Sequence, residues 1–316
     1  LGPMQQRKTR AVSAQVKKGL ARALTKFDAY QLAKYDRDGA VRIRDVLFLT
    51  HAKPKDAAQE KVWKELVDGK LAAPDTWEVN LSGGADKRAT FERLIAERKL
   101  GALALLRNLR GMQVAGVTKS VIGKALDAMR TDRVLPYRFI AAAQYAPDLE
   151  PELEHAMFRS IEGHARLPGK TRLLVDVSGS MEAQMSAKSE MRRLDAACGL
   201  AVLAREIGED VEIFTFSNDV KKVAPRRGFA LRDAIVNSQP HGGTELGKAI
   251  AEVDRKGVRL IVVTDEQSHD VVPAPKGVGY MVNVASYQNG VGHGPWRRID
   301  GFSEKIIDWI ISSEEG

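Results

Sequence analysis

The stretch "LLVDVSGSMEAQM", residues 173–185, decides the fold of the second half of this chain. Three apolar residues run into Asp176, and Ser178 and Ser180 then alternate with small residues. The apolar run is typical of a buried strand, and the short oxygen-bearing side chains are typical of a turn at its end. The stretch is therefore either a well-capped turn or half of a metal site, and the rest of the chain has to decide.

Apolar strands and amphipathic helices alternate after residue 168. The segments "RLLVDVS", "VEIFTFS", "VRLIVVTD" and "GYMVNVAS" are near-continuous Val, Ile and Leu runs, separated by helical patterns such as "KSEMRRLDAACGLAVLAREIG". Runs of this kind predict parallel strands that are buried on both faces. We therefore predict an α/β doubly wound, Rossmann-like domain over residues 169–316.

Polar side chains lie where the predicted strands end. Asp176 closes "LLVD", Asp265 closes "LIVVTD", and Thr244 lies in the polar turn "HGGTE". Because ligands bind at the carboxyl ends of strands in such sheets, we expect one cluster of five side chains: Asp176, Ser178, Ser180, Thr244 and Asp265. Carboxylates and hydroxyls suit a hard divalent cation such as Mg²⁺. With no nitrogen or sulfur donor in the set, zinc is disfavoured.

Residues 11–168 follow a helical pattern throughout. Segments such as "AVSAQVKKGLARALTKF", "AAQEKVWKELVDGKL" and "KSVIGKALDAMRT" place apolar residues three and four apart, and breaks fall at "YDRDG", "AKPKD" and "LSGGAD". Short amphipathic helices joined by short loops predict stacked helical hairpins, a repeat of structure without a fixed sequence period. We predict two domains, a helical one over 11–168 and the α/β one over 169–316.

The charge of the chain is unevenly distributed. The net charge is +8, and residues 1–170 hold 31 Lys and Arg against 20 Asp and Glu, whereas the remainder holds 18 against 21. A basic helical module indicates a polyanionic ligand, and a solvated basic helix face is the alternative.

Two absences in the sequence narrow the class of protein. No apolar run approaches the ~20 residues of a membrane span, and no apolar leader begins the chain, so we expect a cytoplasmic protein. Cys198 is the single cysteine, which excludes intrachain disulfides and cysteine-based zinc sites. Its position in an amphipathic segment predicts a core thiol.

Nine short stretches carry a resemblance to a known family through their order and spacing. They are "QLAKYDRDG", "RDVLFLTHAKPK", "TWEVNLSGGADKRATFERLI", "ALLRNLRGM", "LPYRFIAAAQY", "LLVDVSGSM", "HGGTEL", "VVTDEQ" and "IDGF". Over most of residues 20–305 the chain resembles the Ro ribonucleoprotein family, whose helical part is the TROVE domain. Its second half resembles the von Willebrand factor A fold, and the DxSxS…T…D pattern resembles the metal-ion-dependent adhesion site of that fold.

The resemblance implies a fold and a set of partners. Family members form a ring of HEAT-like helical repeats closed by the A-type domain. They bind small structured noncoding RNAs, called Y RNAs, on the outer surface, and they take single-stranded ends of misfolded RNAs into the central hole. Bacterial members are associated with exoribonucleases, including polynucleotide phosphorylase. We therefore expect a noncatalytic RNA-binding protein of Ro type.

The chain starts well inside the family's usual helical domain. We expect a bacterial or phage Ro-like protein that is shortened at the N-terminal repeats. Its helical part is then either an open crescent or is completed by homo-oligomer formation, and binding of RNA ends in a hole is in doubt. Binding of Y RNA type depends on residues that are present.

The family's Y RNA-binding surface includes a Lys before a Tyr, an Arg two or three residues later, and a His in "HxKP". By this resemblance the matching residues are Lys34, Arg37 and His51, with Lys53 beside the last. Arg37 lies one residue early and has an aspartate on each side, which weakens a phosphate contact. Lys and Arg neutralise phosphates, and a histidine can donate to phosphate or stack on a base. We expect extra contacts from Arg42 and Arg44.

Two alternatives accompany this surface. His51 is otherwise a helix-end histidine that packs on Pro54. The basic arm is otherwise a solvated helix; its residues are Arg7, Lys8, Arg10, Lys17, Lys18 and Arg22.

Three functions remain open from the sequence. The preferred one is the RNA-binding protein described above. The second is an adhesion-type scaffold, in which the metal captures an acidic residue of a protein partner. The third, a metal-dependent nuclease, is disfavoured because a hydroxyl-rich site suits ligand capture better than water activation. His269, in the loop "DEQSHD", is expected to be solvated rather than catalytic.

Overall fold

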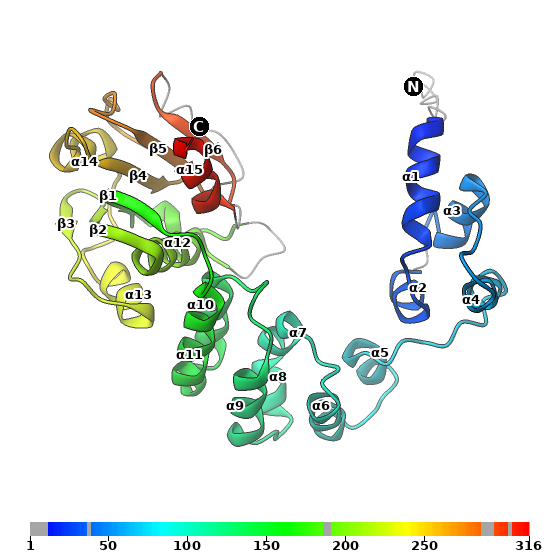
Figure 1. Cartoon of the computed structure of the whole chain (residues 1–316). Coiled ribbons are helices and arrows are strands. Elements are labelled where there is room, and N and C mark those ends of the chain that lie inside the picture. Colours follow the sequence, from blue (N-terminus) through cyan, green and yellow to red (C-terminus); the bar gives the residue numbers. More distant parts are fainter. Residues whose placement is uncertain (1–11, 37–38, 186–190, 286–293, 303–304, 316) are drawn as a thin grey trace, which may run out of the picture. The chain divides into compact units, whose positions relative to one another are not determined.

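The computed structural model describes residues 12–36, 39–185, 191–285, 294–302 and 305–315 (Figure 1). It contains two compact units, Leu1–Asp86 (the N-terminal unit) and Lys87–Gly316 (the C-terminal unit). The change from helices to alternating strands and helices comes later, between Ile161 and Leu167. The predicted fold class, a helical region followed by a doubly wound α/β domain, is confirmed. The compact units divide at residue 86, and the predicted division between two domains at residue 168 stays a prediction.

The described part of the N-terminal unit is helical. Its helices are α1 (Ala14–Leu24), α2 (Ala29–Tyr35), α3 (Ile43–Thr50), α4 (Ala57–Val67) and α5 (Trp77–Ser82). Four of them begin at a side chain that accepts a hydrogen bond from the helix backbone, as expected at an N-cap; these caps are Ser13, Asp28, Asp56 and Thr76. The small core is made by Leu24, Leu32, Leu47, Trp63 and Leu66.

Gln59 joins α4 to the end of α1. Its buried amide donates to the Thr25 carbonyl at 2.9 Å and accepts from the Lys55 backbone N–H at 3.0 Å. We expect Gln59→Met to lower the stability of the N-terminal unit by about 1–2 kcal/mol, because both backbone groups lose their partner. Urea unfolding followed by circular dichroism measures this loss. The control is Lys61→Met, an exposed change on the same helix; equal stability of the two variants would contradict the prediction.

The C-terminal unit begins with six helices. They are α6 (Lys87–Ala96), α7 (Ala102–Arg107), α8 (Leu109–Val114), α9 (Lys119–Ala128), α10 (Pro136–Tyr145) and α11 (Glu150–Ile161). The last two pack on the α/β domain: Gln144 of α10 donates to Asp195 at 2.6 Å, and Glu154 of α11 accepts from the Phe229 N–H at 2.7 Å. Helices α10 and α11 are therefore joined directly to the α/β domain within one compact unit.

The sheet has six strands in the order β3-β2-β1-β4-β5-β6. They are β1 (Leu167–Asp176), β2 (Gly208–Phe216), β3 (Val220–Lys222), β4 (Arg259–Thr264), β5 (Gly279–Asn283) and β6 (Arg297–Asp300). All neighbours pair in parallel except β3, which runs antiparallel to β2. The order reverses at β1 and β4, and such a switch point is where doubly wound sheets bind ligands.

Four α-helices accompany the strands. They are α12 (Arg193–Ile207), α13 (Gly228–Val236), α14 (Leu246–Val253) and α15 (Ile306–Glu315). Helix α12 is buried over most of its length, including the free thiol of Cys198, whose pKa is raised by burial. The prediction of a core thiol is confirmed.

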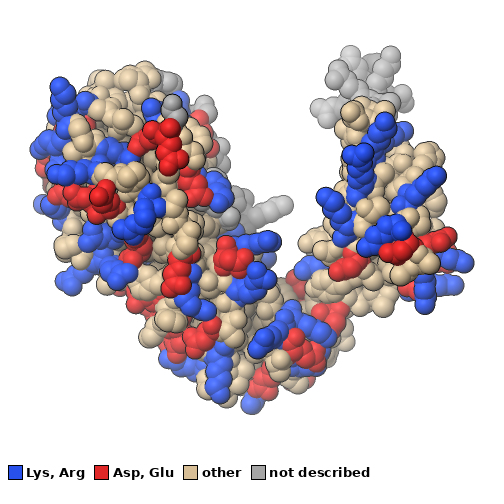
Figure 2. All heavy atoms as spheres, viewed as in Figure 1, with Lys and Arg blue, Asp and Glu red and all other residues tan. Residues whose placement is uncertain are grey.

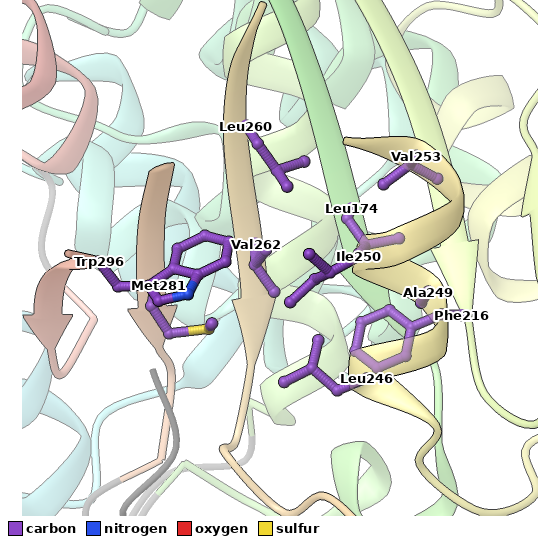
Figure 3. Close-up of a cluster of buried hydrophobic side chains, with 10 residues drawn as sticks. All are labelled: Leu174, Phe216, Leu246, Ala249, Ile250, Val253, Leu260, Val262, Met281 and Trp296. Carbon is purple, nitrogen blue, oxygen red and sulfur yellow. The ribbon is translucent and has the colours of Figure 1, made fainter. Parts of the chain in front are cut away.

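One apolar core lies between the sheet and α14. Figure 3 shows Leu174 of β1 and Val262 of β4 beside Ile250 of α14, with Leu246 on the same helix and Met281 of β5 on the other side of Val262. All of these side chains are at least 99% buried. The sheet residues between them, such as those of β5, are buried as well, which explains why the strands read as continuous apolar runs. None of the described helices is long and apolar enough to cross a membrane.

Candidate metal site and candidate RNA-binding residues

The loop after β1 brings the first three predicted metal-site residues together. The Ser178 N–H donates to Asp176 Oδ1 at 2.8 Å, and the hydroxyl oxygens of Ser178 and Ser180 lie 3.2 Å apart. The Thr264 hydroxyl at the end of β4 donates to Asp176 Oδ2 at 2.7 Å. The loop is thus held at the switch point between β1 and β4.

The "HGGTE" loop lies against the loop after β1. The Gly179 N–H donates to the Gly242 carbonyl at 3.2 Å, which joins the two loops. The Ser217 hydroxyl, just after β2, accepts from the Gly242 N–H at 2.8 Å, and Asn218 Oδ1 accepts from the Gly243 N–H at the same distance. Thr244 follows directly and is buried. The loop that contains Thr244 therefore lies next to the loop that contains the serines, and a common site for these side chains stays a prediction.

Asp265, which follows β4, is the fourth part of the site. Its carboxylate is fully buried, and its Oδ2 accepts from Arg193 Nη1 at 2.6 Å. The same nitrogen donates to the Ser180 carbonyl at 3.1 Å. Arg193 therefore connects Asp265 to the loop after β1, which the sequence did not predict.

Ionisation of Asp176 is made costly by its surroundings. Burial raises the pKa of Asp176 to about 6, hydrogen bonds from Ser178 and Thr264 act against this, and the charge of Asp265 adds to the rise. Two carboxylates that are buried side by side favour a bound cation, because its charge offsets their desolvation and repulsion.

These residues fit a hard divalent cation. Ser178, Ser180 and Thr244 would hold the ion through their hydroxyls, and Asp176 and Asp265 would balance its charge. The 3.2 Å between the two serine oxygens suits adjacent ligands of one ion. Within the described ranges no three His, Cys, Asp or Glu side chains form a metal-binding group, so this set depends on its hydroxyls. The site and its preference for Mg²⁺ remain predictions.

The loop after Asp265 has a structural role that sequence reasoning missed. His269 is exposed, as predicted, but its backbone N–H donates to the Thr244 carbonyl at 3.1 Å. Its Nδ1 accepts from the Thr244 N–H at 3.4 Å. Asp270 accepts from the Gly247 and Lys248 N–H groups at 2.8 Å each, at the start of α14. In the sequence, the only sign of this role was an aspartate in "DEQSHD" that could cap the helix after "HGGTE".

These hydrogen bonds also set the ionisation of Asp270. Partial burial raises its pKa, but hydrogen bonds from Gly247, Ser268 and Lys248 outweigh burial and lower the pKa overall. The loop is therefore anchored by an ionised carboxylate at a helix N-terminus, where negative charge is favourable.

The predicted RNA-binding residues lie at both ends of α3 and on α2. Lys34 is half-buried at the end of α2 and lies over the Tyr30 ring, 5.7 Å from its centroid. Arg42 precedes α3, and Arg44 Nε lies 3.9 Å from Asp45 Oδ1. Arg37 lies outside the described residues, as do three residues of the basic arm, Arg7, Lys8 and Arg10.

His51 ends α3 in an uncommon backbone conformation. Its φ of 48° lies in the left-handed region, where glycine is the usual residue. The residue is exposed, as is Lys53 two positions later. A non-glycine residue costs stability at such a position, so its imidazole is a candidate for function.

The distance between these candidates along α3 is considerable. Arg42 and His51 flank the eight residues of α3 and are nine positions apart, a rise of about 13.5 Å along the helix. Figure 2 shows further Lys and Arg side chains along the visible face of α1; the described ones are Lys17, Lys18 and Arg22.

Comparison with known domains identifies two parts of the chain. The TROVE domain matches residues 67–213, and the von Willebrand factor type A domain matches residues 171–267. The chain thus contains a region that matches the TROVE domain and an overlapping region that matches the von Willebrand factor type A domain. The TROVE match crosses from the helices into the sheet, which belong to one compact unit from Lys87 onward. It begins after Lys34, Arg37, Arg42, Arg44, His51 and Lys53, so that match does not cover the predicted RNA-binding residues.

Solved structures similar to this chain include the Ro (RSR) protein of Deinococcus radiodurans. The likeness has 21% identity and a TM-score of 0.62 and covers 95% of this chain and 77% of that one, which shows the fold over both units' sequence. The BatB protein of Bacteroides thetaiotaomicron (18% identity, TM-score 0.34, 46% and 97% covered) is also similar. An aerotolerance-related membrane protein of Bacteroides fragilis is similar as well, with 20% identity and a TM-score of 0.29, over 46% of this chain and 88% of that one. No curated protein sequence matches the chain.

Proposed function

We propose that this chain is a Ro-type RNA-binding protein that binds a small structured noncoding RNA of Y RNA type. The observation that carries the proposal is the exposed His51 in its left-handed conformation, close in sequence to Lys53 and at the end of the helix that follows Lys34. The N-terminal unit as a whole is basic: residues 1–86 hold 16 Lys and Arg against 11 Asp and Glu. Cationic side chains of this kind bind phosphates.

The proposal includes a metal and a protein partner. A divalent cation, Mg²⁺, is held by Ser178, Ser180 and Thr244, with the charges of Asp176 and Asp265 beside it. The resemblance to Ro proteins extends the proposal to RNA quality control with an exoribonuclease such as polynucleotide phosphorylase. The proposed function contains no chemical step, so the partner cleaves the RNA and this chain binds it.

The test is filter binding of a Y RNA at low and moderate salt. We expect Lys34→Ala/Arg37→Ala/His51→Ala to lower the affinity about 100-fold, because the variant lacks two side chains that bind phosphates and one that binds a base or a phosphate. The slope of log K against log salt should fall by about 0.7–0.9 for each phosphate that the variant no longer neutralises.

A control variant removes three positive charges from the C-terminal unit, one more than the test variant loses with a neutral His51. Arg98, Arg107 and Arg110 are exposed there, and their triple alanine variant loses three positive charges outside the proposed site. We expect it to bind with less than about tenfold loss, as a general charge effect. Equal losses in the two triple variants would reject the assignment of Lys34, Arg37 and His51.

A second candidate function is supported by the hydroxyl set at the switch point. In it, the metal held by Ser178 and Ser180, whose oxygens are 3.2 Å apart, captures an acidic side chain of a protein partner. EDTA separates the two functions. It abolishes metal-dependent capture of a partner, whereas it leaves phosphate contacts of the N-terminal unit in place.

A further inference from the structure

Arg193 gives the candidate metal site a positive charge of its own. It is the first residue of α12, and only 7% of it is exposed. Its Nη1 lies 2.6 Å from Asp265 Oδ2 and 3.1 Å from the Ser180 carbonyl oxygen. The guanidinium therefore lies between a predicted metal-binding loop and one of the two carboxylates that would balance the metal's charge.

The other carboxylate of the site has a different environment. Asp176 accepts from the Ser178 N–H and from the Thr264 hydroxyl, and both of these donors are neutral. Asp265 accepts from the neutral Gln267 N–H at 3.3 Å and from the cationic Arg193. The two carboxylates and one guanidinium carry a net charge of −1 at neutral pH when all three are ionised.

We propose that Arg193 acts as an internal counter-ion which holds Asp265 in place without metal and lowers the affinity of the site for divalent cations. A divalent ion at the hydroxyls of Ser178 and Ser180 is attracted less strongly by Asp265, because the Arg193 guanidinium already offsets part of that negative charge. The ion also lies close to a fixed positive charge. Both effects oppose binding, and neither requires the arginine to contact the metal.

A competing charge and a purely supporting side chain predict opposite changes in metal affinity when Arg193 is removed. If Arg193 only oriented Asp265, its removal would leave the carboxylate less well positioned and would lower the affinity for the metal ion. If Arg193 acts as a competing charge, its removal raises the affinity for the metal ion. Repulsion between a unit charge and a divalent ion at about 6 Å corresponds to roughly tenfold in affinity even at the dielectric constant of water.

The experiment is calorimetric titration of the full chain with MgCl₂ and with MnCl₂. We expect Arg193→Gln, which retains an N–H donor without the charge, to bind both ions about tenfold more tightly than the wild type. Arg193→Met is a second neutral variant with the same expected result. Arg193→Lys keeps the charge and is expected to bind as weakly as the wild type.

Arg192 provides the matched control. It precedes Arg193 and is half-buried. It forms ion pairs with Asp195 at 3.1 Å and with Glu182 at 2.6 Å, whereas Arg193 pairs with Asp265. Arg192→Gln removes the same charge one residue away and should change metal affinity by less than about threefold.

A second measurement separates metal affinity from any loss of stability in the variants. Removing one partner of a buried ion pair destabilises a protein, so each variant is also followed by calorimetric unfolding in EDTA and in Mg²⁺. We expect the rise in Tm caused by Mg²⁺ to be larger in Arg193→Gln than in the wild type, whatever the Tm in EDTA is.

The outcomes separate this inference from the proposal on which it rests, the metal bound at these hydroxyls. Equal or weaker metal binding by both neutral variants rejects the role of Arg193 and leaves the metal site standing. If no protein, wild type included, binds either ion, the metal site itself is rejected together with the inference.

Discussion

Gly199→Ala is expected to lower the stability of the C-terminal unit by about 3 kcal/mol, because α10 and α12 touch at this glycine. A Cβ at residue 199 would lie 2.5 Å from Tyr137 Cβ, 2.9 Å from its Cα and 3.0 Å from its backbone nitrogen. Two of these atoms belong to the backbone of α10, so no side-chain rotation removes the overlap. The helices must move apart, and the packing around Tyr137, itself 5% exposed, is lost with them.

Calorimetric unfolding measures this change. For a unit of this size a loss of about 3 kcal/mol lowers Tm by roughly 6–12 °C. The control is Gly111→Ala on α8, an exposed helical glycine with nothing within 4 Å of the added carbon. There alanine should raise stability by up to about 1 kcal/mol, since it favours the helix. Similar effects at both positions would show that α10 and α12 are not in close contact.

Asp176→Asn is expected to stabilise the metal-free protein at alkaline pH and to abolish its stabilisation by Mg²⁺. Burial raises the pKa of Asp176 from 3.8 to about 6. A carboxyl with a raised pKa contributes stability that is fully present below pH 3.8 and is lost as the pH rises through 6. Above that range the ionised, buried carboxylate costs the folded protein about 3 kcal/mol.

The asparagine removes this cost and keeps most of the local bonds. Its oxygen can accept from the Ser178 N–H, whereas the hydrogen bond from the Thr264 hydroxyl, 2.7 Å in length, must rearrange. Loss of that bond costs about 1 kcal/mol, which leaves a net gain of about 2 kcal/mol at pH 8 in EDTA. At pH 4 the variant should have no advantage, because the wild-type side chain is then largely neutral.

Paired unfolding measurements at pH 4 and pH 8, with EDTA or with Mg²⁺, test both halves of this prediction. Other titrating groups are common to the two proteins, so the difference between them isolates residue 176. We expect Mg²⁺ to raise the Tm of the wild type at pH 8 and to leave the variant unchanged. A variant that gains as much from Mg²⁺ as the wild type would remove Asp176 from the metal site.

Much of the α/β domain could be predicted from local sequence patterns. Continuous apolar runs are dictated by burial on both faces, and the helical periods between them require parallel connections. Polar residues at the ends of two such runs must then share one edge of the sheet. This is why Asp176 and Asp265 could be placed together although 89 positions separate them in the sequence.

The division into compact units could not be predicted in this way. Residues 87–161 have the same helical pattern as residues 14–82, so periodicity does not separate them. What separates them is packing: α10 lies on α12 because Gly199 has no side chain to keep Tyr137 away. A lone glycine in a helical segment does not indicate by itself which helix will contact it.

The amino-acid sequence alone determined the strands, the turns and the oxygen-bearing side chains of the candidate site, since each depends on neighbours within a few residues. Only the tertiary structure decided what surrounds those side chains. Arg193 and Asp265 are 72 residues apart, and their ion pair depends on how α12 packs on the sheet. The left-handed backbone of His51 likewise follows from the path of the chain after α3. Composition and periodicity describe which surfaces become buried, whereas the pairing of charges inside them depends on the packed geometry.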